Sequence, residues 1–208
     1  MTIYDLTKRT LDVAVAAAVL VVLLPLLAVV AAAVALVDGR PVFFRQRRPG
    51  VGGKPFTMLK FRTMSHAPEC GREGDGRRIT RLGRFLRSTS LDELPEFYNV
   101  LKGEMSLVGP RPLLTEYLSR YTPEQARRHE VKPGLTGLAQ VQGRNDVDWI
   151  RRLELDVWYV DHRGLLLDLQ IVMRTIGVVF SRRGIHAEGH ATMPEFQGAL
   201  TTAAPGEE

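Results

Sequence analysis

Two adjacent carboxylates, Asp92 and Glu93, follow a stretch that supplies the cations Arg84 and Arg87. Phosphoryl transfer needs such a combination, because a carboxylate can attack phosphorus or bind a metal ion while cations spread the developing negative charge. Neighbouring residues of a helix point about 100° apart, so we expect the two acids to have separate tasks. A helix N-terminus would also keep a carboxylate ionised, as a nucleophile requires. Asp92 and Glu93 are therefore candidates for attack and for metal binding.

A structural interpretation fits the same residues. Ser90-Leu91-Asp92-Glu93 matches the S-x-x-E capping box, in which Glu93 bonds back to the cap and both acids suit the positive end of a helix. By spacing alone, capping is favoured over catalysis. The pattern itself leaves both interpretations open.

Other patterns carry weaker signals. Pro110-Arg111-Pro112 predicts a rigid turn that projects one guanidinium, useful against a nucleotide phosphate or base, although a structural turn is more common. His186 and His190 have the i, i+4 spacing of metal ligands but no third ligand, so no metal site is expected there. The sequence contains neither GxxxxGK[ST] nor GxGxxG, which argues against an ordinary NTPase or dinucleotide enzyme.

The composition indicates one domain and an anionic partner. With 208 residues, 45% of them hydrophobic, the chain can fill one ordinary core with an appendage but not two large domains. The net charge of +5 and the pI near 9.6 come mainly from arginine, whose guanidinium forks onto phosphate oxygens. Membrane-proximal positive charge is the alternative cause. Cys70 is the single cysteine, which excludes an internal disulfide and a cysteine-based zinc site.

Residues 13–37 carry no charged side chain, and as a helix they would extend about 37 Å, more than a hydrocarbon core of about 30 Å. The run exceeds the apolar region of a signal peptide, about 7–15 residues, and lacks a convincing processing site. Lys8 and Arg9 precede it and Arg40 and Arg45 follow it, so both flanks favour the cytoplasm. Pro25 would bend the helix at membrane depth. Two interpretations remain open: a single span, and a re-entrant helix that bends near Pro25.

The rest of the chain predicts one compact α+β domain. A hairpin is expected around the turn at residues 49–53, and Thr122 is expected to cap a helix that begins at Pro123. Helices are expected at residues 81–87, 90–101, 147–160 and 165–180, with loop and short strand at 131–143. The aromatic residues of the last two helices are assigned to core packing over interfacial anchoring. Residues 65–78 are predicted to form a mobile loop over a site.

Six motifs occur in order between Lys8 and about Phe180: KRTLD, PVFFRQRRPG, KPFTMLKFRTM, RITRLGRFLRSTSLDELPEFYNVLKGEMSLVGPRPL, VKPGLTGLAQVQGRN and ELDVWYVD. By these motifs the sequence resembles the monotopic phosphoglycosyl transferases, the bacterial sugar transferase family that starts glycan assembly on polyprenol phosphate. One position departs from the family, which commonly has Ser-Pro at the membrane bend where this chain has Leu24-Pro25. Pro25 still permits the bend, but a hydroxyl that could satisfy broken backbone bonds is lost.

The resemblance implies roles for individual residues. Asp92 would be the nucleophile, with Glu93 as its partner, and the two would hold Mg²⁺. Lys60 and Arg87 would lie in the active site, and Arg144 would contact phosphate. The uridine nucleotide would be held by Pro110, Arg111 and Pro112.

The resemblance also implies a domain organisation and a reaction. Residues 1–39 would form a re-entrant membrane helix, 40–183 the catalytic sugar transferase domain and 184–208 a flexible tail. Asp92 would take a phosphosugar from a nucleoside diphosphate sugar as a covalent intermediate and pass it to polyprenol phosphate, initiating exopolysaccharide or glycan assembly. The enzyme would lie on the cytoplasmic face of the bacterial inner membrane, and no nucleic acid partner is expected. The competing functions are a membrane-anchored adaptor without catalysis and a lipid-phosphate hydrolase.

Overall fold

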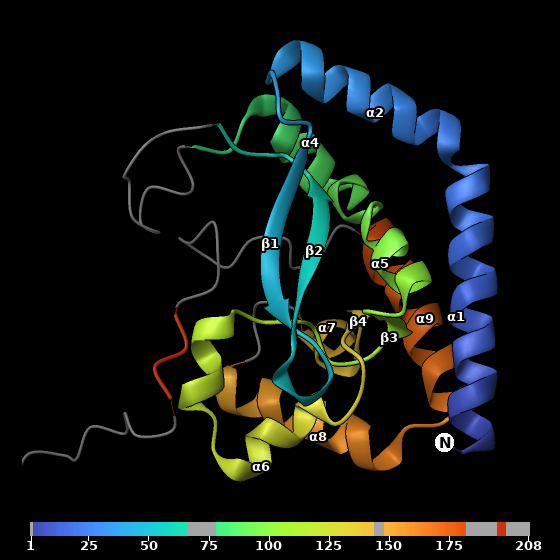
Figure 1. The fold of residues 1–208 in the computed structure, drawn as a ribbon, viewed down its shortest axis with the longest axis vertical. Helices are drawn as coiled ribbons and strands as arrows, with labels where there is room; N and C mark the ends of the chain where they lie inside the picture. The colour runs from blue at the N-terminus through green and yellow to red at the C-terminus, as the bar shows by residue number, and fades with distance from the viewer. Residues whose placement is uncertain (1, 66–77, 144–147, 182–194, 199–208) are drawn as a thin grey trace, which may run out of the picture.

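The computed structural model describes residues 2–65, 78–143, 148–181 and 195–198. These residues form two small sheets surrounded by helices, with two long helices along one edge of the molecule (Figure 1). This arrangement agrees with the α+β class expected from the sequence.

The long edge consists of α1 (Ile3–Val22) and α2 (Leu24–Val37), which meet at an angle of 63°. The break lies at Leu23, and Pro25 occupies the first turn of α2, where its missing N–H is tolerated. The bend expected near Pro25 is therefore confirmed. Among the described helices none is long and apolar enough to cross a membrane alone, whereas this bent pair meets the length and composition criteria together.

Both helices pack one side on the domain and expose apolar side chains on the other. Ala16 of α1 is fully buried against Val100 and Met105, while Val34 of α2 packs with Phe61 and Leu86. The opposite sides expose large apolar residues: Leu6, Leu11, Val21, Val22, Leu24, Val29, Leu36 and Val37. The packed sides therefore fix the bend relative to the rest of the protein.

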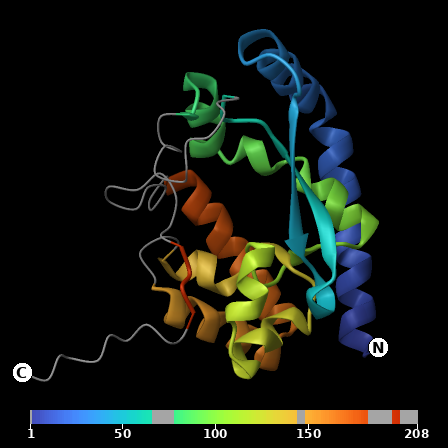
Figure 2. The same cartoon turned by 60° about the vertical axis from the view of Figure 1, so that its left-hand side comes forward.

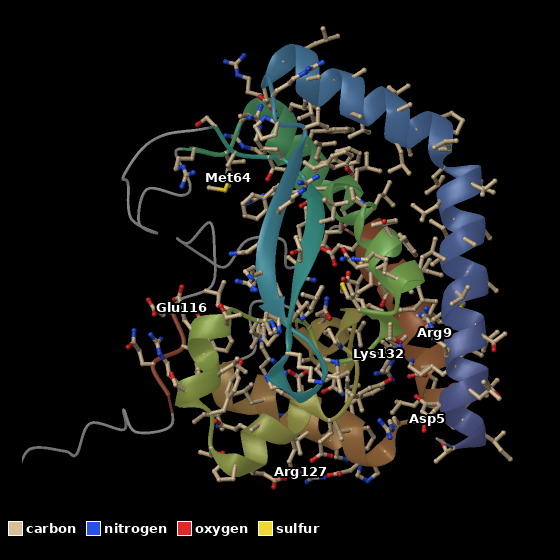
Figure 3. All side chains as sticks on the ribbon, in the orientation of Figure 1. Asp5, Arg9, Met64, Glu116, Arg127 and Lys132 are labelled. Carbon is tan, nitrogen blue, oxygen red and sulfur yellow. The ribbon has the colours of Figure 1, made fainter. Side chains whose placement is uncertain are left out.

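Polar contacts also hold α1 against the domain. Figure 3 shows Arg9 pointing from α1 toward the domain, where its guanidinium donates to the carbonyls of Val100 and Leu101 at 2.7 and 2.8 Å. Asp12 is buried and accepts a bond from the backbone N–H of Leu107 at 3.0 Å. Because these partners are backbone groups, the contacts fix the position of α1 along the domain.

The predicted hairpin is confirmed as β1 (Phe43–Pro49) and β2 (Pro55–Phe61), joined by η1 (Val51–Gly53). Gly52 and Gly53 adopt positive φ in this connection, a conformation that glycine reaches without strain. The antiparallel register pairs Phe44 with Lys60. β2 thereby carries Lys60 toward the centre of the molecule.

The helix predicted at residues 90–101 is wrong as a single element. After α4 (Arg81–Ser88), the chain forms the short 3₁₀ turn η3 (Leu91–Glu93) and then α5 (Glu96–Lys102). Ser90 has a left-handed backbone with φ of 56°, and its side chain makes no cap hydrogen bond. The capping box is therefore absent, and Asp92 and Glu93 lie in a tight turn before the helix.

The C-terminal half contains a parallel pair, β3 (Ser106–Val108) with β4 (Gly134–Thr136), and short turns between them. Thr122 caps the predicted helix as expected, through a capping box with Gln125. The elements are η4 (Thr115–Arg120), α6 (Pro123–Ala126), η5 (Arg127–His129), α7 (Leu138–Gly143), α8 (Trp149–His162) and α9 (Leu165–Ser181). The last two helices confirm the sequence prediction, whereas α7 replaces part of the loop expected there.

Aromatic side chains pack together in the C-terminal half of the fold. Tyr159 of α8 is buried in the hydrophobic core, as the sequence predicted for these aromatic residues. Trp158 of the same helix is 45% exposed. Phe196 is 3% exposed and packs against Tyr117 and Trp149. Phe196 lies in residues 184–208, the segment expected to be a tail, of which the structure describes 195–198.

Candidate active site

A cavity of about 970 Å³ opens between the hairpin, η3, α5 and α9. Its polar wall contains Lys60 and Arg87 beside Asp92 and Glu93, together with Arg111 from the turn after β3. The structure therefore brings together the two carboxylates and three of the cations expected at the site. Met64, labelled in Figure 3, also lines this cavity.

Glu93 is the centre of the charged cluster. Its Oε1 accepts from Lys60 Nζ at 2.7 Å and also from Arg111 Nη2. Lys60 Nζ in turn lies 3.0 Å from Oε1 of Glu96, a carboxylate whose side chain is 2% exposed. Three parts of the chain, the hairpin, η3 and the turn after β3, are thus joined through one carboxylate.

The environments of the two adjacent acids drive their pKa values apart. Burial by itself would raise the pKa of Glu93, but the charges of Arg111 and Lys60 and their hydrogen bonds hold that pKa well below its usual range. For Asp92, burial raises the pKa, and the nearby charge of Glu93 adds to the rise against the cations Lys60 and Arg87. Asp92 lies in a short 3₁₀ turn, not in the first turn of a helix as expected, and its surroundings raise its pKa. The expectation of separate tasks fits the divergent pKa values.

Arg87 is positioned by a close approach of two backbones. Its Nε donates to Thr63 Oγ1 at 3.0 Å from the last turn of α4. One turn earlier, Gly83 lies against the backbone of Thr63, where an added Cβ would come within 2.0 Å of the Thr63 carbonyl oxygen. Only a residue without a side chain allows α4 to lie this close to the end of β2.

The Pro110-Arg111-Pro112 turn is rigid because other residues bond each of its carbonyls. The Pro110 carbonyl accepts from the backbone N–H of Gly134 at 3.0 Å, and the Pro112 carbonyl accepts from Arg48 at 3.2 Å. The Arg111 carbonyl accepts from Arg128 at 2.7 Å. This confirms the rigid turn, and the Arg111 guanidinium reaches the cavity while Pro110 and Pro112 remain buried.

Arg128 is a supporting residue that the sequence analysis missed. It is almost fully buried and forms an ion pair with Asp156 of α8 at 2.7 Å. The same guanidinium donates a hydrogen bond to the backbone carbonyl of Arg111. No local pattern points to this pairing, because the partners are far apart in the chain. Glu96 was also missed, although its position three residues after Glu93 could have indicated a shared site.

The donor set fits Mg²⁺ in its usual phosphate-bound mode, in which one or two carboxylates share the ion with substrate phosphates and water. Asp92 and Glu93 supply two carboxylates at the cavity, and the ion pairs of Glu93 with Lys60 and Arg111 both use Oε1. Within the described residues, no group of three or more His, Cys, Asp or Glu could hold a metal ion. The residues therefore suit an ion that the substrate helps to bind.

Three sequence expectations lie outside the described residues. Arg144 belongs to residues 144–147, most of the expected mobile loop belongs to residues 66–77, and His186 and His190 belong to residues 182–194.

Comparison with known proteins matches residues 3–182 to the bacterial sugar transferase family. The chain belongs to this family. The match covers the hairpin, η3 and the Pro110-Arg111-Pro112 turn, so the whole charged cluster lies within the family domain. The expectation of a transferase enzyme is confirmed.

Relatives of this sugar transferase carry more specific names. It is 53% identical over 172 residues to EpsL of Bacillus subtilis, named an uncharacterized sugar transferase, covering 81% of this chain and 84% of the relative. It is 47% identical over 186 residues to a UDP-glucose:undecaprenyl-phosphate glucose-1-phosphate transferase of Caulobacter vibrioides, covering 83% and 69%. The exopolysaccharide production protein ExoY of Sinorhizobium fredii is 39% identical over 198 residues, covering 86% and 88%.

Proposed function

We propose that this sugar transferase moves a sugar phosphate from a uridine diphosphate sugar to polyprenol phosphate and so initiates exopolysaccharide or glycan assembly. The observation that carries the proposal is a buried carboxylate, Asp92, on the same cavity as a cluster of cations arranged around Glu93. The names of the relatives supply the substrate classes, a UDP-sugar donor and an undecaprenyl phosphate acceptor.

In the first step, a carboxylate oxygen of Asp92 attacks the sugar-bearing phosphorus of the donor. The bond from that phosphorus to the bridging oxygen breaks, and uridine monophosphate leaves with the electron pair. Arg111, Lys60 and Arg87 stabilise the charge that develops on the phosphoryl oxygens. The burial that raises the pKa of Asp92 also removes water that would shield its charge.

In the second step, an oxygen of polyprenol phosphate attacks the phosphorus of the aspartyl phosphosugar. The bond between phosphorus and Asp92 breaks, which regenerates the carboxylate and yields a polyprenyl diphosphosugar. The same three cations stabilise charge in both steps, because both steps transfer the same phosphoryl group. One carboxylate therefore divides a difficult transfer into two displacements.

Glu93 and Asp92 would hold Mg²⁺ together with the donor diphosphate. The ion, when bound, would neutralise charge on the diphosphate and on the leaving nucleotide. The low pKa of Glu93 supports this role, because a metal ligand must be ionised at neutral pH. Lys60 and Arg111 keep Glu93 ionised and oriented before substrates arrive.

The α1 and α2 pair is proposed to insert as a re-entrant helix from the cytoplasmic face of the bacterial inner membrane. The 63° bend, the exposed apolar sides and the basic residues at both ends support this arrangement. It would place a soluble nucleotide sugar and a lipid phosphate at one interface.

Sugar transfer in lipid nanodiscs tests the function. With radiolabelled donor and undecaprenyl phosphate, wild-type protein should form a lipid diphosphosugar and release uridine monophosphate. An adaptor would form neither product, and a hydrolase would release inorganic phosphate without the lipid product.

Mixed with donor alone, the protein should gain the mass of one phosphosugar on the peptide that contains Asp92. An adduct of equal yield in Asp92→Asn would refute Asp92 as the nucleophile and make Glu93 the first alternative.

A further inference from the structure

The active-site cavity has a second wall of opposite chemistry. Apart from the charged cluster, the lining includes side chains of α1, α5, β3, α7 and α9. None of these side chains is charged, Gln140 and Thr175 are polar, and the others are apolar, among them Val15, Phe97, Leu107, Val141, Val172 and Ile176. We call this set the apolar wall. It belongs to the same cavity as Asp92, so a single ligand can touch both.

The apolar wall is continuous with the outer surface of α9. Four residues of this helix, Leu166, Leu169, Met173 and Ile176, recur at helical spacing and are 70, 57, 60 and 46% exposed. Ile176 belongs both to this exposed stripe and to the lining of the cavity. The helix itself extends from the end of α8 toward α4 (Figure 2).

The α1 helix contributes Val15 to the apolar wall. This side chain is 41% exposed and also lines the cavity. Val15 and Ile176 are therefore two members of the apolar wall that are also exposed on the surface, and they line the same cavity as Asp92.

We infer that the apolar wall binds the isoprenoid segment next to the acceptor phosphate, with Ile176 and Val15 at its entrance. The inference rests on the proposed function and assigns the acceptor's hydrocarbon to the face between α1, α5 and α9. The phosphate end of the acceptor then lies at Lys60, Arg87 and Arg111, within reach of the aspartyl phosphosugar.

The donor does not suit this wall. A uridine nucleotide and a sugar carry hydroxyl, amide and phosphate groups, which would lose their hydrogen bonds to water against apolar side chains. An isoprenoid has no such groups and gains from leaving water. In a two-step reaction the phosphoryl site serves both substrates in turn, but the apolar wall is used by the acceptor alone.

The test compares Ile176→Asn with Met173→Asn, because both positions lie on the exposed stripe of α9 but only Ile176 lines the cavity. Both variants lose the same kind of surface, so effects on membrane affinity should match. In nanodiscs, Ile176→Asn should raise the apparent KM for undecaprenyl phosphate about tenfold or more, whereas Met173→Asn should change it less than about threefold. Ile176→Leu should restore the wild-type value.

A second acceptor separates hydrocarbon binding from other defects. With ethyl phosphate, an acceptor that carries no isoprene unit, the two Asn variants should transfer equally well. Val15→Asn against Leu11→Asn repeats the comparison on α1 and keeps the test valid if an α9 variant misfolds. Equal KM values for undecaprenyl phosphate within both pairs would overturn the inference. Absence of transfer by the wild-type protein would instead overturn the proposed function itself.

Discussion

Lys60 and Glu93, which are 33 residues apart in the chain, form an ion pair with Nζ and Oε1 separated by 2.7 Å. Lys60 comes from the end of β2 and Glu93 from η3, and Oε1 of Glu96 lies 3.0 Å from the same ammonium group. Burial by itself would lower the pKa of Lys60, but these two carboxylates raise it above its usual value. The lysine is therefore fully charged at neutral pH and holds the acidic turn against the hairpin.

Replacing Lys60 with methionine should leave Glu93 and Glu96 without this cation. Because breaking a buried ion pair leaves an uncompensated charge, we expect a loss of about 3 kcal/mol in the free energy of unfolding. Transfer should fall as well, since Glu93 loses a partner that keeps it ionised. Lys102→Met is the matched control, because Lys102 forms an exposed pair with Glu104 and should change neither property noticeably. Urea unfolding of both variants measures the difference, and equal losses would contradict the role of Lys60.

Asp92→Asn separates a nucleophile from a structural residue. Removing the attacking charge should lower transfer by several orders of magnitude. Burial and the charge of Glu93 raise the pKa of Asp92, so its ionised form opposes folding above the unfolded pKa, and this loss grows as the pH rises through the folded value. The neutral variant should therefore unfold at a higher temperature than wild type at pH 7. A residue that only capped a helix would instead lose about 1 kcal/mol of stability and keep its activity.

Gly83→Ala should displace α4 from the end of β2. The added Cβ would come within 2.0 Å of the Thr63 carbonyl oxygen, so the helix must shift and Arg87 must lose its bond to Thr63. Overpacking of this kind should cost about 1–3 kcal/mol and reduce transfer. Gly177→Ala is the control in α9, where an added Cβ has no neighbour within 4 Å and should stabilise by up to about 1 kcal/mol. Thermal unfolding with a transfer assay would reveal whether the two alanines act in opposite directions.

His129 predicts a pH dependence of stability. Burial and the neighbouring Arg128 lower the pKa of His129 to about 4, below its ordinary value of 6.5. Between these values the unfolded chain binds more protons than the folded one, so stability should fall as the pH decreases from 6.5 to 4. The contribution cannot exceed about 1.4 kcal/mol per pH unit. Urea midpoints at pH 7 and 5 should fall less for His129→Gln than for wild type, and parallel declines would rule out this histidine as the cause.

The membrane arrangement can be tested by labelling cysteines from outside the cell. In a Cys70→Ser background, cysteine is introduced at Ile3, the first residue of α1, or at Arg40, which follows α2. A re-entrant helix keeps both sites in the cytoplasm, so an impermeant thiol reagent should label neither in intact spheroplasts and both after the membrane is opened. Labelling of the Ile3 site alone in intact spheroplasts would establish a single span.

The sequence by itself determined the features that depend on local pattern. Pro25 in an apolar run predicted the bend, because proline cannot continue a helix through its interior but is tolerated in the first turn of a new one. The glycine-rich turn predicted the hairpin, and helical spacing predicted α8 and α9. The motifs around Asp92 and Glu93 predicted the family, because they depend on residue order alone.

Tertiary structure decided the chemistry of the site. Ser90 adopts a left-handed turn instead of capping a helix, so Asp92 and Glu93 are placed by contacts with β2 and not by their own spacing. The opposite pKa shifts of these neighbours come from burial and from cations distant in the chain, since the free energy of a charge depends on its three-dimensional surroundings. The hydrogen bond from Arg128 to the Arg111 carbonyl also depends on tertiary structure. No local pattern encodes it, because it exists only once α8 has packed against the turn.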